Sequence, residues 1–349
     1  NLWIGTEDAG LNKLNMKDHS YTSFNDMKGL SQNCIHGLAS IDNHLWIGTH
    51  ANGIDLMDIR TEKIIKHYTI SVNPYANKND IIVYLYKLQN NDLLVATALG
   101  VYQYNSQKDI FEKLSQFPNN CRIQTLFEDH DGVIWAGTSS KGLYYYNPAT
   151  SQHGEFKLDT VNTSRTINNI YEDRKNNLWF ATGDGIKIYD RSTQQTTKYD
   201  MQDGLPSNVI YRIEEDKKGN MWISTANGLA RLNPKNHKIK VFKKEHGLTS
   251  NQFNYNSSLK TDNDKLYFGT LKGMISFQPN SIQEFSIQPK VYISQINYND
   301  PDHNFLHQEA ITFKKGITLE HNQSTFYIDY TSLSYQAPNL TQYAYCMEG

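Results

Sequence analysis

A five-residue pattern of apolar and small positions recurs seven times along the chain. Each copy reads apolar, large apolar or aromatic, apolar, small and then threonine, and successive copies begin 41 to 48 residues apart. The copies occupy residues 2–6, 45–49, 93–97, 134–138, 178–182, 221–225 and 266–270. A period of about 40–50 residues is typical of propellers and other repeat architectures.

Each position of the pattern has a packing interpretation. The second position holds all five tryptophans, with Leu94 and Tyr267 in the other two copies. Because the first and third positions are also apolar, both faces of this strand are expected to be buried between neighbouring blades, whereas a sandwich strand would alternate. The small fourth position lets a neighbouring blade approach closely, and the β-branched threonine suits a strand end. A glycine three or four residues after each copy predicts a short hairpin loop.

The repeat that follows Asn208 illustrates one whole blade. Its apolar-rich segments at 209–216, 221–225, 229–233 and 238–243 are separated by polar or glycine-containing turns. Four antiparallel strands per period make a propeller blade. The sequence therefore predicts an all-β fold in which residues 1–283 form a seven-bladed β-propeller of four-stranded antiparallel blades.

Two strands are missing from the predicted ring. Second and third strands are recognisable in all seven copies, but first strands and fourth strands are recognisable in only six each. We expect residues upstream of Asn1 to supply this inner and this outer strand, as in a chain cut from a longer one. The third blade has Leu94 in place of tryptophan, which removes about 1–2 kcal/mol of apolar burial, so it is expected to pack most loosely.

A different pattern begins after the last repeat. Short apolar segments at 291–296, 317–319 and 326–330 are separated by polar turns, which is typical of a β-sandwich. An Ig-like domain has about 100 residues, so residues 284–349 are predicted to form the first half of one.

Composition narrows the function classes. The net charge of −2 argues against a polyanion-binding body, and no nucleic-acid binding is expected. Three cysteines do not make a disulfide framework, and no apolar run reaches 18 residues. The twelve histidines lack a zinc-ligand spacing, and neither a glycine-rich phosphate loop nor a serine nucleophile elbow occurs. We therefore expect no metal, no cofactor and no catalytic residue in this chain.

The repeat and its linkers resemble the two-component-regulator propeller family. The resemblance rests on the Leu-Trp-Ile-Gly-Thr copies, on the linkers 204–208 and 247–253, and on the tail 343–349. That tail is similar to the Tyr-x-Tyr-x-Leu-x-Gly motif of the Ig-like domain that follows such propellers, with Met347 in place of leucine. The resemblance covers essentially the whole chain.

This resemblance implies the periplasmic sensor region of a hybrid two-component regulator that detects fragments of complex glycans. The partners expected are an oligosaccharide ligand and a second copy of the chain in a homodimer. The resemblance also implies that a flanking transmembrane helix, a histidine kinase and a receiver lie outside this chain. The chain itself would then have no kinase chemistry.

Candidate ligand contacts lie on one face of the predicted ring. Because strand directions alternate, the loop between the second and third strands shares a face with the linker to the next blade, and binding residues are commonly carried on such loops. Arg122, Lys141 and Arg165 fall there in adjacent blades, where they would hold a carboxylate or sulfate by charge-assisted hydrogen bonds. The other candidates are Asp184, Asn208 and Asn227, together with Tyr211 and Phe253 as sugar-stacking rings. A solvated rim and ordinary core packing are the alternatives.

Two other function classes remain open. Asp129-His130-Asp131-Gly132 before Trp135 is superficially similar to the Asp-box of sialidases, which keeps a propeller-fold glycoside hydrolase or lyase as one alternative. The same turn recurs at 173–176 and 216–219, and a residue repeated in several blades indicates a turn former rather than one catalytic acid. A non-catalytic protein-interaction propeller is the second alternative, although the Trp-Asp signature of the WD40 type is missing.

Overall fold

The computed structural model describes residues 1–70, 81–158, 164–282, 290–300, 305–310, 316–321, 325–332 and 343–346. The chain divides into two compact units. The first comprises Asn1–Lys244 and Leu248–Pro279, and the second holds Asn280–Gly349. The domain boundary predicted at residues 283 and 284 lies outside the described residues.

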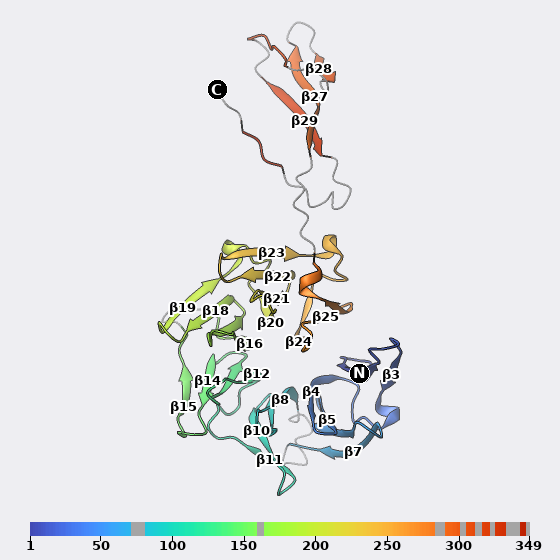
Figure 1. Cartoon of the computed structure of the whole chain (residues 1–349), viewed down its shortest axis with the longest axis vertical. Helices are drawn as coiled ribbons and strands as arrows, with labels where there is room; N and C mark the ends of the chain where they lie inside the picture. Colours follow the sequence, from blue (N-terminus) through green and yellow to red (C-terminus); the bar gives the residue numbers. More distant parts are fainter. Residues whose placement is uncertain are drawn as a thin grey trace. The chain divides into compact units, whose positions relative to one another are not determined.

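The first unit is a β-propeller of seven antiparallel sheets, here numbered as blades 1 to 7 in chain order (Figure 1). Blades 1 and 2 contain β1 (Leu2–Gly5), β2 (Leu11–Leu14), β3 (Tyr21–Phe24), β4 (Ile35–Ile41), β5 (His44–Thr49), β6 (Ile54–Asp58) and β7 (Lys63–Tyr68). Blades 3 and 4 contain β8 (Ile82–Lys87), β9 (Leu93–Thr97), β10 (Gly100–Asn105), β11 (Ile110–Lys113), β12 (Ile123–Glu128), β13 (Ile134–Thr138), β14 (Leu143–Tyr146) and β15 (His153–Phe156). Blades 5 to 7 contain β16 (Ile167–Glu172), β17 (Leu178–Thr182), β18 (Gly185–Asp190), β19 (Gln195–Tyr199), β20 (Ile210–Glu215), β21 (Met221–Thr225), β22 (Gly228–Asn233), β23 (Lys238–Phe242), β24 (Phe253–Lys260), β25 (Leu266–Thr270) and β26 (Gly273–Phe277).

The strand count agrees with the sequence prediction. Blades 2 to 6 have four strands each, whereas blade 1 lacks an inner strand and blade 7 lacks an outer strand among the described residues. The inner strands of successive blades contact one another from β4 through β8, β12, β16 and β20 to β24. These inner strands therefore line the axis of the ring. Trp3 on β1 is only partly buried, because no strand pairs with the other edge of β1 in the described structure.

The small fourth position of the repeat is where one blade contacts the next. A Cβ atom added to Gly48 would lie 2.5 Å from Cγ2 of Ile82, and one added to Gly137 would lie 2.7 Å from Cγ2 of Ile167. Both isoleucines belong to the inner strand of the following blade. Contacts this short leave no room for a larger side chain, so the predicted close approach of blades is confirmed.

The threonine of the repeat closes the loop that follows it. In all seven blades its Oγ1 donates a hydrogen bond of 2.8 or 2.9 Å to the carbonyl oxygen of the loop glycine. Each of these glycines has a positive φ, between 70° and 141°, which glycine adopts without steric cost. The threonine therefore has a second role besides its preference for strands, because its hydroxyl group holds the loop closed.

The aspartates of the Asp-box-like turns hold the tryptophans of blades 4, 5 and 6. Trp222 donates its indole N–H to Asp216 Oδ2 at 3.0 Å, and the backbone N–H groups of Lys218 and Asn220 donate to Asp216 Oδ1. Asp129 and Asp173 make the corresponding bonds to Trp135 and Trp179. Burial acts to raise the pKa of Asp216, but these hydrogen bonds outweigh it and hold the pKa below its usual value.

An acidic residue just before the turn aspartate joins each of these blades to the one before it. Glu128 accepts a hydrogen bond from the backbone N–H of Gln89, and Glu172 accepts one from that of His130. Glu215 accepts one from Arg174 in the same way. The turns of neighbouring blades are therefore tied together on the face opposite the predicted ligand contacts.

The second unit contains a three-stranded antiparallel sheet in the order β28 (Phe305–Ala310), β27 (Val291–Asp300) and β29 (Phe326–Ser332). Strands were predicted at 291–296 and 326–330, and both occur. The segment 317–319 was also predicted as a strand but has no strand conformation, whereas β28 was not predicted. The Ig-like assignment stays a prediction.

Blade 3 gives no sign of loose packing in its central strand. All five residues of β9, including Leu94, are buried as fully as the tryptophan-bearing strands of the neighbouring blades. The leucine is surrounded by apolar residues of blades 3 and 4. The expected loosening of this blade stays a prediction about stability.

Asp216→Ala is expected to lower the free energy of unfolding by about 1–3 kcal/mol, because the indole and two backbone N–H groups lose a buried acceptor. Urea unfolding measures this difference. The control is Asp262→Ala, an exposed residue in the corresponding turn of blade 7, which should change stability by no more than about 0.5 kcal/mol. Equal effects of the two substitutions would contradict the assigned role of Asp216.

Candidate ligand-binding face

The linkers on the predicted ligand face are held by asparagine side chains. Three linkers begin with a single 3₁₀ turn, at Asp26–Lys28, Met201–Asp203 and Lys244–His246. In each of these linkers, the Oδ1 atom of a later asparagine accepts a hydrogen bond from the first backbone N–H of the turn. These asparagines are, in chain order, Asn33, Asn208 and Asn251. Because the same bond occurs in three linkers, Asn208 has a scaffold role in addition to its predicted place on the ligand face.

The three predicted basic residues lie around the same loop but point in different directions. The carbonyl of Arg122 accepts a hydrogen bond from Ser139, and that of Arg165 accepts one from Gly142. Arg122 is half-buried and its Nε donates to Gln124 Oε1 at 3.0 Å, whereas Arg165 is exposed. Lys141 is exposed and reaches Asn119 O at 3.4 Å. Only Arg122 therefore faces the inner strands.

The remaining predicted residues are dispersed over blades 5 to 7. Asp184 forms an ion pair with Lys198 at 3.0 Å, and the exposed Asn227 donates to Pro206 O at 3.4 Å. Tyr211 is half-buried on the inner strand β20. Phe253 is 2 % exposed and packs edge-on against Phe268, so it belongs to the core of blade 7 and offers no stacking surface.

A one-residue bulge near the start of each complete inner strand shapes the axis. The bulged residues are His36, Val83, Gln124, Asn168 and Tyr211. His36 Nδ1 lies 3.1 Å from Ile82 O, and Asn168 Nδ2 donates to Ile210 O at 2.7 Å. In both cases the acceptor is the residue just before the bulge of the next blade. These two bulges therefore bind neighbouring inner strands together at the mouth of the axis, in blades 2 and 3 and in blades 5 and 6.

Blade 7 carries a longer bulge that crosses the axis. Residues 254–257 lie opposite Gly269 alone, and Asn256 within this segment has a φ of 50°. Its Nδ2 donates to Val83 O at 3.3 Å and to Gln124 O at 3.2 Å. These carbonyls belong to blades 3 and 4, on the far side of the ring. This bulge therefore narrows the mouth of the axis and places Tyr255 there.

A charged network lies deeper along the axis. Arg212 Nε donates to Ser258 Oγ at 2.9 Å, and Ser258 Oγ donates to Glu214 Oε1 at 2.6 Å. The Arg212 guanidinium also lies 5.7 Å from the ring centroid of Tyr84 in blade 3. Burial raises the pKa of Glu214, and the Arg212 charge and the Ser258 hydrogen bond offset only part of this effect.

Sequence reasoning missed a group of residues at the axis mouth. Cys34, His36 and His50 lie together there, and the His36 ring packs edge-on against both His50 and Tyr255. The positive charge of Arg122 acts on His36 and on Tyr255. The sequence signal was the Cys-x-His pair, but the third member is 14 residues further along the chain. Burial lowers the pKa of His36, and the neighbouring His50 acts in the same direction.

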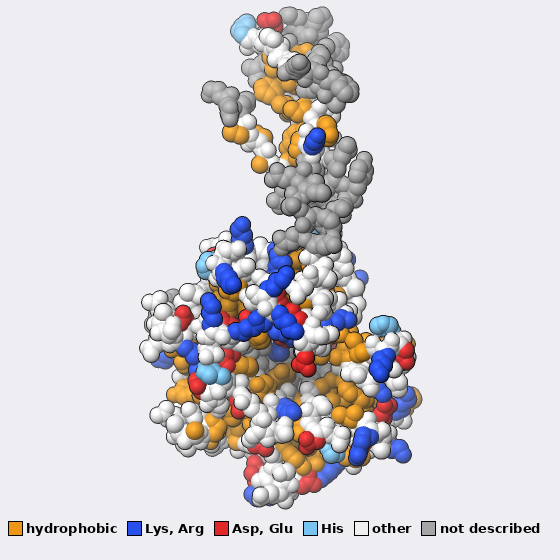
Figure 2. All heavy atoms as spheres, in the orientation of Figure 1, with side chains coloured by type: hydrophobic (Ala, Val, Ile, Leu, Met, Phe, Trp, Pro, Cys, Tyr) orange, Lys and Arg blue, Asp and Glu red, His pale blue; other side chains and the backbone are white. Residues whose placement is uncertain are grey.

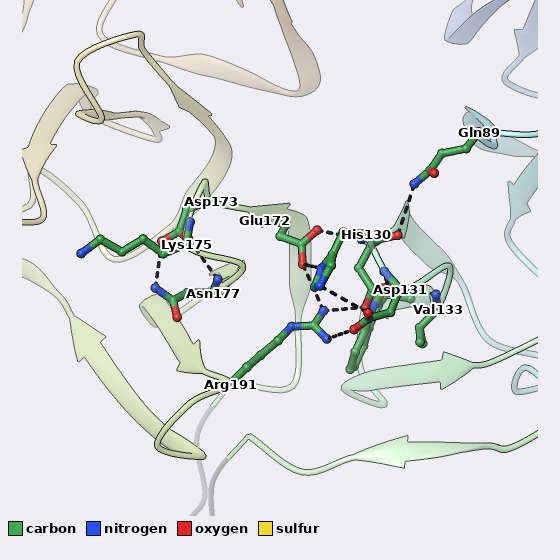
Figure 3. Close-up of polar contacts among 11 residues, drawn as sticks. Gln89, His130, Asp131, Val133, Glu172, Asp173, Lys175, Asn177 and Arg191 are labelled. Atoms are coloured by element: carbon green, nitrogen blue, oxygen red, sulfur yellow. Dashed lines mark hydrogen bonds and ion pairs between the residues drawn. The ribbon is translucent and has the colours of Figure 1, made fainter. Parts of the chain in front are cut away.

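The opposite face has its own charged groups. Figure 3 shows Arg191 pointing at the turn of blade 4, where its guanidinium binds Asp129 at 2.6 Å and Asp131 at 2.9 Å. Glu172 lies 3.2 Å from the same guanidinium and also accepts from His130. Lys and Arg side chains gather over the blade of β20–β23 (Figure 2). The exposed lysines of that blade include Lys217, Lys218, Lys235 and Lys238, all in or beside turns of this face.

The Asp-box-like carboxylates are occupied by structural bonds. Asp129 is fully buried, and its two oxygens accept from Trp135, from Arg191 and from the turn backbone. The turn-former interpretation of these aspartates is therefore the one that the hydrogen bonds support. Blade 4 also has a hollow of about 300 Å³ lined by Val133, Trp135, Tyr145, Asn147, Gln152 and Phe156.

Glu214→Gln is expected to raise the melting temperature at pH 7 relative to the unchanged chain, and to raise it less at pH 4. Because the folded state raises the pKa of Glu214, it binds more protons than the unfolded state between the usual and the raised value. This contribution to stability is complete below the usual pKa and is lost as pH rises through the raised one. Thermal unfolding at both pH values measures the difference. A difference in melting temperature between the variant and the unchanged chain that is the same at both pH values would contradict the prediction.

None of the helices in the described part of the chain is long and apolar enough to cross a membrane.

Three of the repeats match a known family model. The model of the two component regulator propeller matches residues 116–140, 163–184 and 204–227, which contain the central patterns of blades 4, 5 and 6. The chain is 29 % identical to the histidine kinase P4 of Formosa agariphila, over all of this chain and 27 % of that protein.

Two solved structures superpose on this chain. The extracellular domain of the hybrid two component system BT3049 from B. thetaiotaomicron superposes with a TM-score of 0.79 at 25 % identity, over 97 % of this chain and 46 % of that one. The virginiamycin B lyase of Staphylococcus aureus superposes with a TM-score of 0.53 at 15 % identity, over 80 % of this chain and 85 % of the lyase, which shows the fold alone. The chain thus spans about a quarter of the histidine kinase and less than half of the matched sensor structure. Three of its seven blades match the model of the two component regulator propeller.

Proposed function

We propose that this chain is the extracytoplasmic, periplasmic sensing region of a membrane-anchored hybrid two-component regulator, and that its ligand is an oligosaccharide from a complex glycan. The observation that carries the proposal is similarity along nearly the whole chain to the extracellular domain of a hybrid two component system, in a molecule that also aligns with a histidine kinase. In this proposal the kinase and its membrane anchor lie outside this chain.

The axis mouth on the face of Arg122 is the proposed ligand position. Arg122 is half-buried and its positive charge acts on Tyr255, which is 41 % exposed. An aromatic face next to a fork of N–H donors suits a sugar ring that carries hydroxyl or acidic substituents. Arg165 and Lys141, exposed in the neighbouring blades, extend this positive rim outward. The proposed ligand therefore lies across blades 4 and 5 and reaches the axis.

The scaffold supports a sensing role because these loops are held rigidly. The threonine bonds, the linker asparagines and the bulge contacts fix the loops to neighbouring blades. A ligand changes a conformational equilibrium only by its difference in affinity for the two states. We therefore propose that the ligand acts by changing how the whole propeller pairs in a homodimer, and that the second unit passes this change to the kinase.

A propeller-fold glycoside hydrolase or lyase is the second candidate, because the turn at Asp129 to Gly132 before Trp135 is similar to the Asp-box of sialidases. The occupied carboxylates of Asp129, Asp173 and Asp216 speak against acid–base catalysis at these turns. A protein-interaction propeller without a small ligand is the third candidate.

The double substitution Arg122→Ala and Arg165→Ala is expected to weaken oligosaccharide binding about 100-fold or more, since each of the two lost charge-assisted hydrogen bonds contributes at least about 1.5 kcal/mol. Isothermal titration calorimetry measures the change. The matched control is Lys217→Ala with Lys218→Ala, which removes the same charge from the opposite face. Unchanged affinity in the arginine variant, or an equal loss in the lysine variant, would place the ligand elsewhere.

A thermal-shift screen of neutral, uronic and sulfated oligosaccharides is expected to give at least one stabilising compound that is recovered intact. A ligand at 100 times its Kd stabilises the folded state by about 2.7 kcal/mol. Chromatography of the compound after incubation distinguishes a sensor from an enzyme. Cleavage would support the lyase or hydrolase, and no response to any glycan would support the protein-interaction propeller.

A further inference from the structure

A group of three metal-ligating side chains lies at the axis mouth of blade 2. One donor atom each from Cys34, His36 and His50 lies within 4.8 Å of the others. Thiolate and imidazole are the ligands that Zn²⁺ and related borderline-soft cations prefer, whereas Mg²⁺ and Ca²⁺ prefer oxygen. The chemistry of the group therefore indicates one class of ion.

The strand register brings these residues together. Cys34 precedes β4 and His50 follows β5, and Ile35 pairs with Thr49 between the two strands. The backbone N–H of His50 donates to Cys34 O at 2.9 Å, so these two residues lie side by side. His36 is the bulged residue of β4, and its Nε2 lies 3.5 Å from Cys34 Sγ.

The surroundings of His36 leave one ring nitrogen ready to bind a cation. Its Nδ1 lies 3.1 Å from Ile82 O, and a carbonyl oxygen only accepts, so Nδ1 carries the hydrogen. Nε2 then has a free lone pair, and it is the nitrogen that faces Cys34. A metal-bound histidine usually donates its other ring N–H to a carbonyl or carboxylate in this way.

His50 adds a second indication. Its Nδ1 is buried and has no hydrogen-bond partner among the described residues, although buried polar atoms are almost always paired. The His50 ring lies 4.7 Å from the His36 ring, centroid to centroid. A bound cation would give the His50 ring a partner and would replace the 3.5 Å hydrogen bond between the Cys34 thiol and His36 Nε2.

The charges nearby are mixed and favour a cation overall. The loop of blade 1 brings Glu7 and Asp8 close enough for their negative charges to act on Cys34, and Glu7 also acts on His36. Arg122 acts on His36 with the opposite sign. On metal binding the Cys34 thiol releases its proton to solvent, so a thiolate adds one more negative charge.

We propose that Cys34, His36 and His50 bind one Zn²⁺-class divalent cation, with water or the Glu7 carboxylate in the fourth position. This site joins the start of β4 to the loop after β5 and lies beside Tyr255 at the axis mouth. The cation site is separate from the sensing role, and it does not require a bound oligosaccharide.

Cobalt substitution tests the site directly. The 349-residue chain is freed of metal with a chelator, desalted and titrated with Co²⁺, and a thiolate-to-cobalt charge-transfer band is expected at one equivalent. Cys34→Ser should abolish the band, and His36→Ala and His50→Ala should each weaken Zn²⁺ binding about tenfold or more in competition titrations. Cys346→Ser, which changes an exposed cysteine of the second unit, is the control and should leave both unchanged.

Three results would contradict the proposed cation site. No charge-transfer band in the unchanged chain, or a band that survives Cys34→Ser, would overturn the proposal. Zn²⁺ binding that is unaffected by either histidine substitution would do the same. Oligosaccharide titrations run in the presence of chelator keep this test separate from that of the sensing role, since either can fail without the other.

Discussion

The contact between a small residue of one blade and the inner strand of the next is the constraint on which the rest of this structure depends. Gly48 against Ile82 and Gly137 against Ile167 leave less space than a single methyl group needs. Blades therefore stack at one distance and one angle. The tryptophans fill the wider, outer part of the same interface, where Trp46 contacts Tyr104 and Phe111 of blade 3. Interiors packed in this way tolerate little change in side-chain volume, so these contacts, together with that of Gly5 against Ile35, fix the spacing of the blades they join.

Hydrogen bonds of polar side chains add to the apolar packing between blades. Each turn between first and second strands in blades 4 to 6 is organised by an aspartate, and the acidic residue before it reaches the previous blade. On the other face, the repeated threonine closes the loop, and the bulged residues His36 and Asn168 bind carbonyls of the next inner strand. Neighbouring blades are thus connected on both faces by polar bonds as well as by apolar packing. A rigid scaffold is what places binding side chains accurately on loops.

The axis mouth gathers functional chemistry from several blades. His36 and Cys34 come from blade 2, Arg122 and Gln124 from blade 4, and Tyr255 from the long bulge of blade 7. The proposed oligosaccharide and the proposed cation would lie beside each other there. A cation that orders the start of β4 would also affect the ring of Tyr255, which packs against His36. The structure thereby relates two proposals that rest on separate observations.

The sequence alone determined the repeat, the seven blades and the two incomplete ones, because a strand buried on both faces needs the same apolar and small residues in every copy. It also predicted that Arg122 lies on the same face as the loop between the second and third strands, where Ser139 binds its carbonyl, since strand direction alternates in any blade. It did not distinguish Arg122, which faces the axis, from Arg165, which faces solvent, because this depends on which end of the loop 139–142 each backbone carbonyl binds, Ser139 for Arg122 and Gly142 for Arg165. Nor did it predict that Asn256 would cross the ring or that Cys34, His36 and His50 would meet. Bulge length and strand register decide those positions, and they are set by contacts between strands rather than by any pattern within one strand.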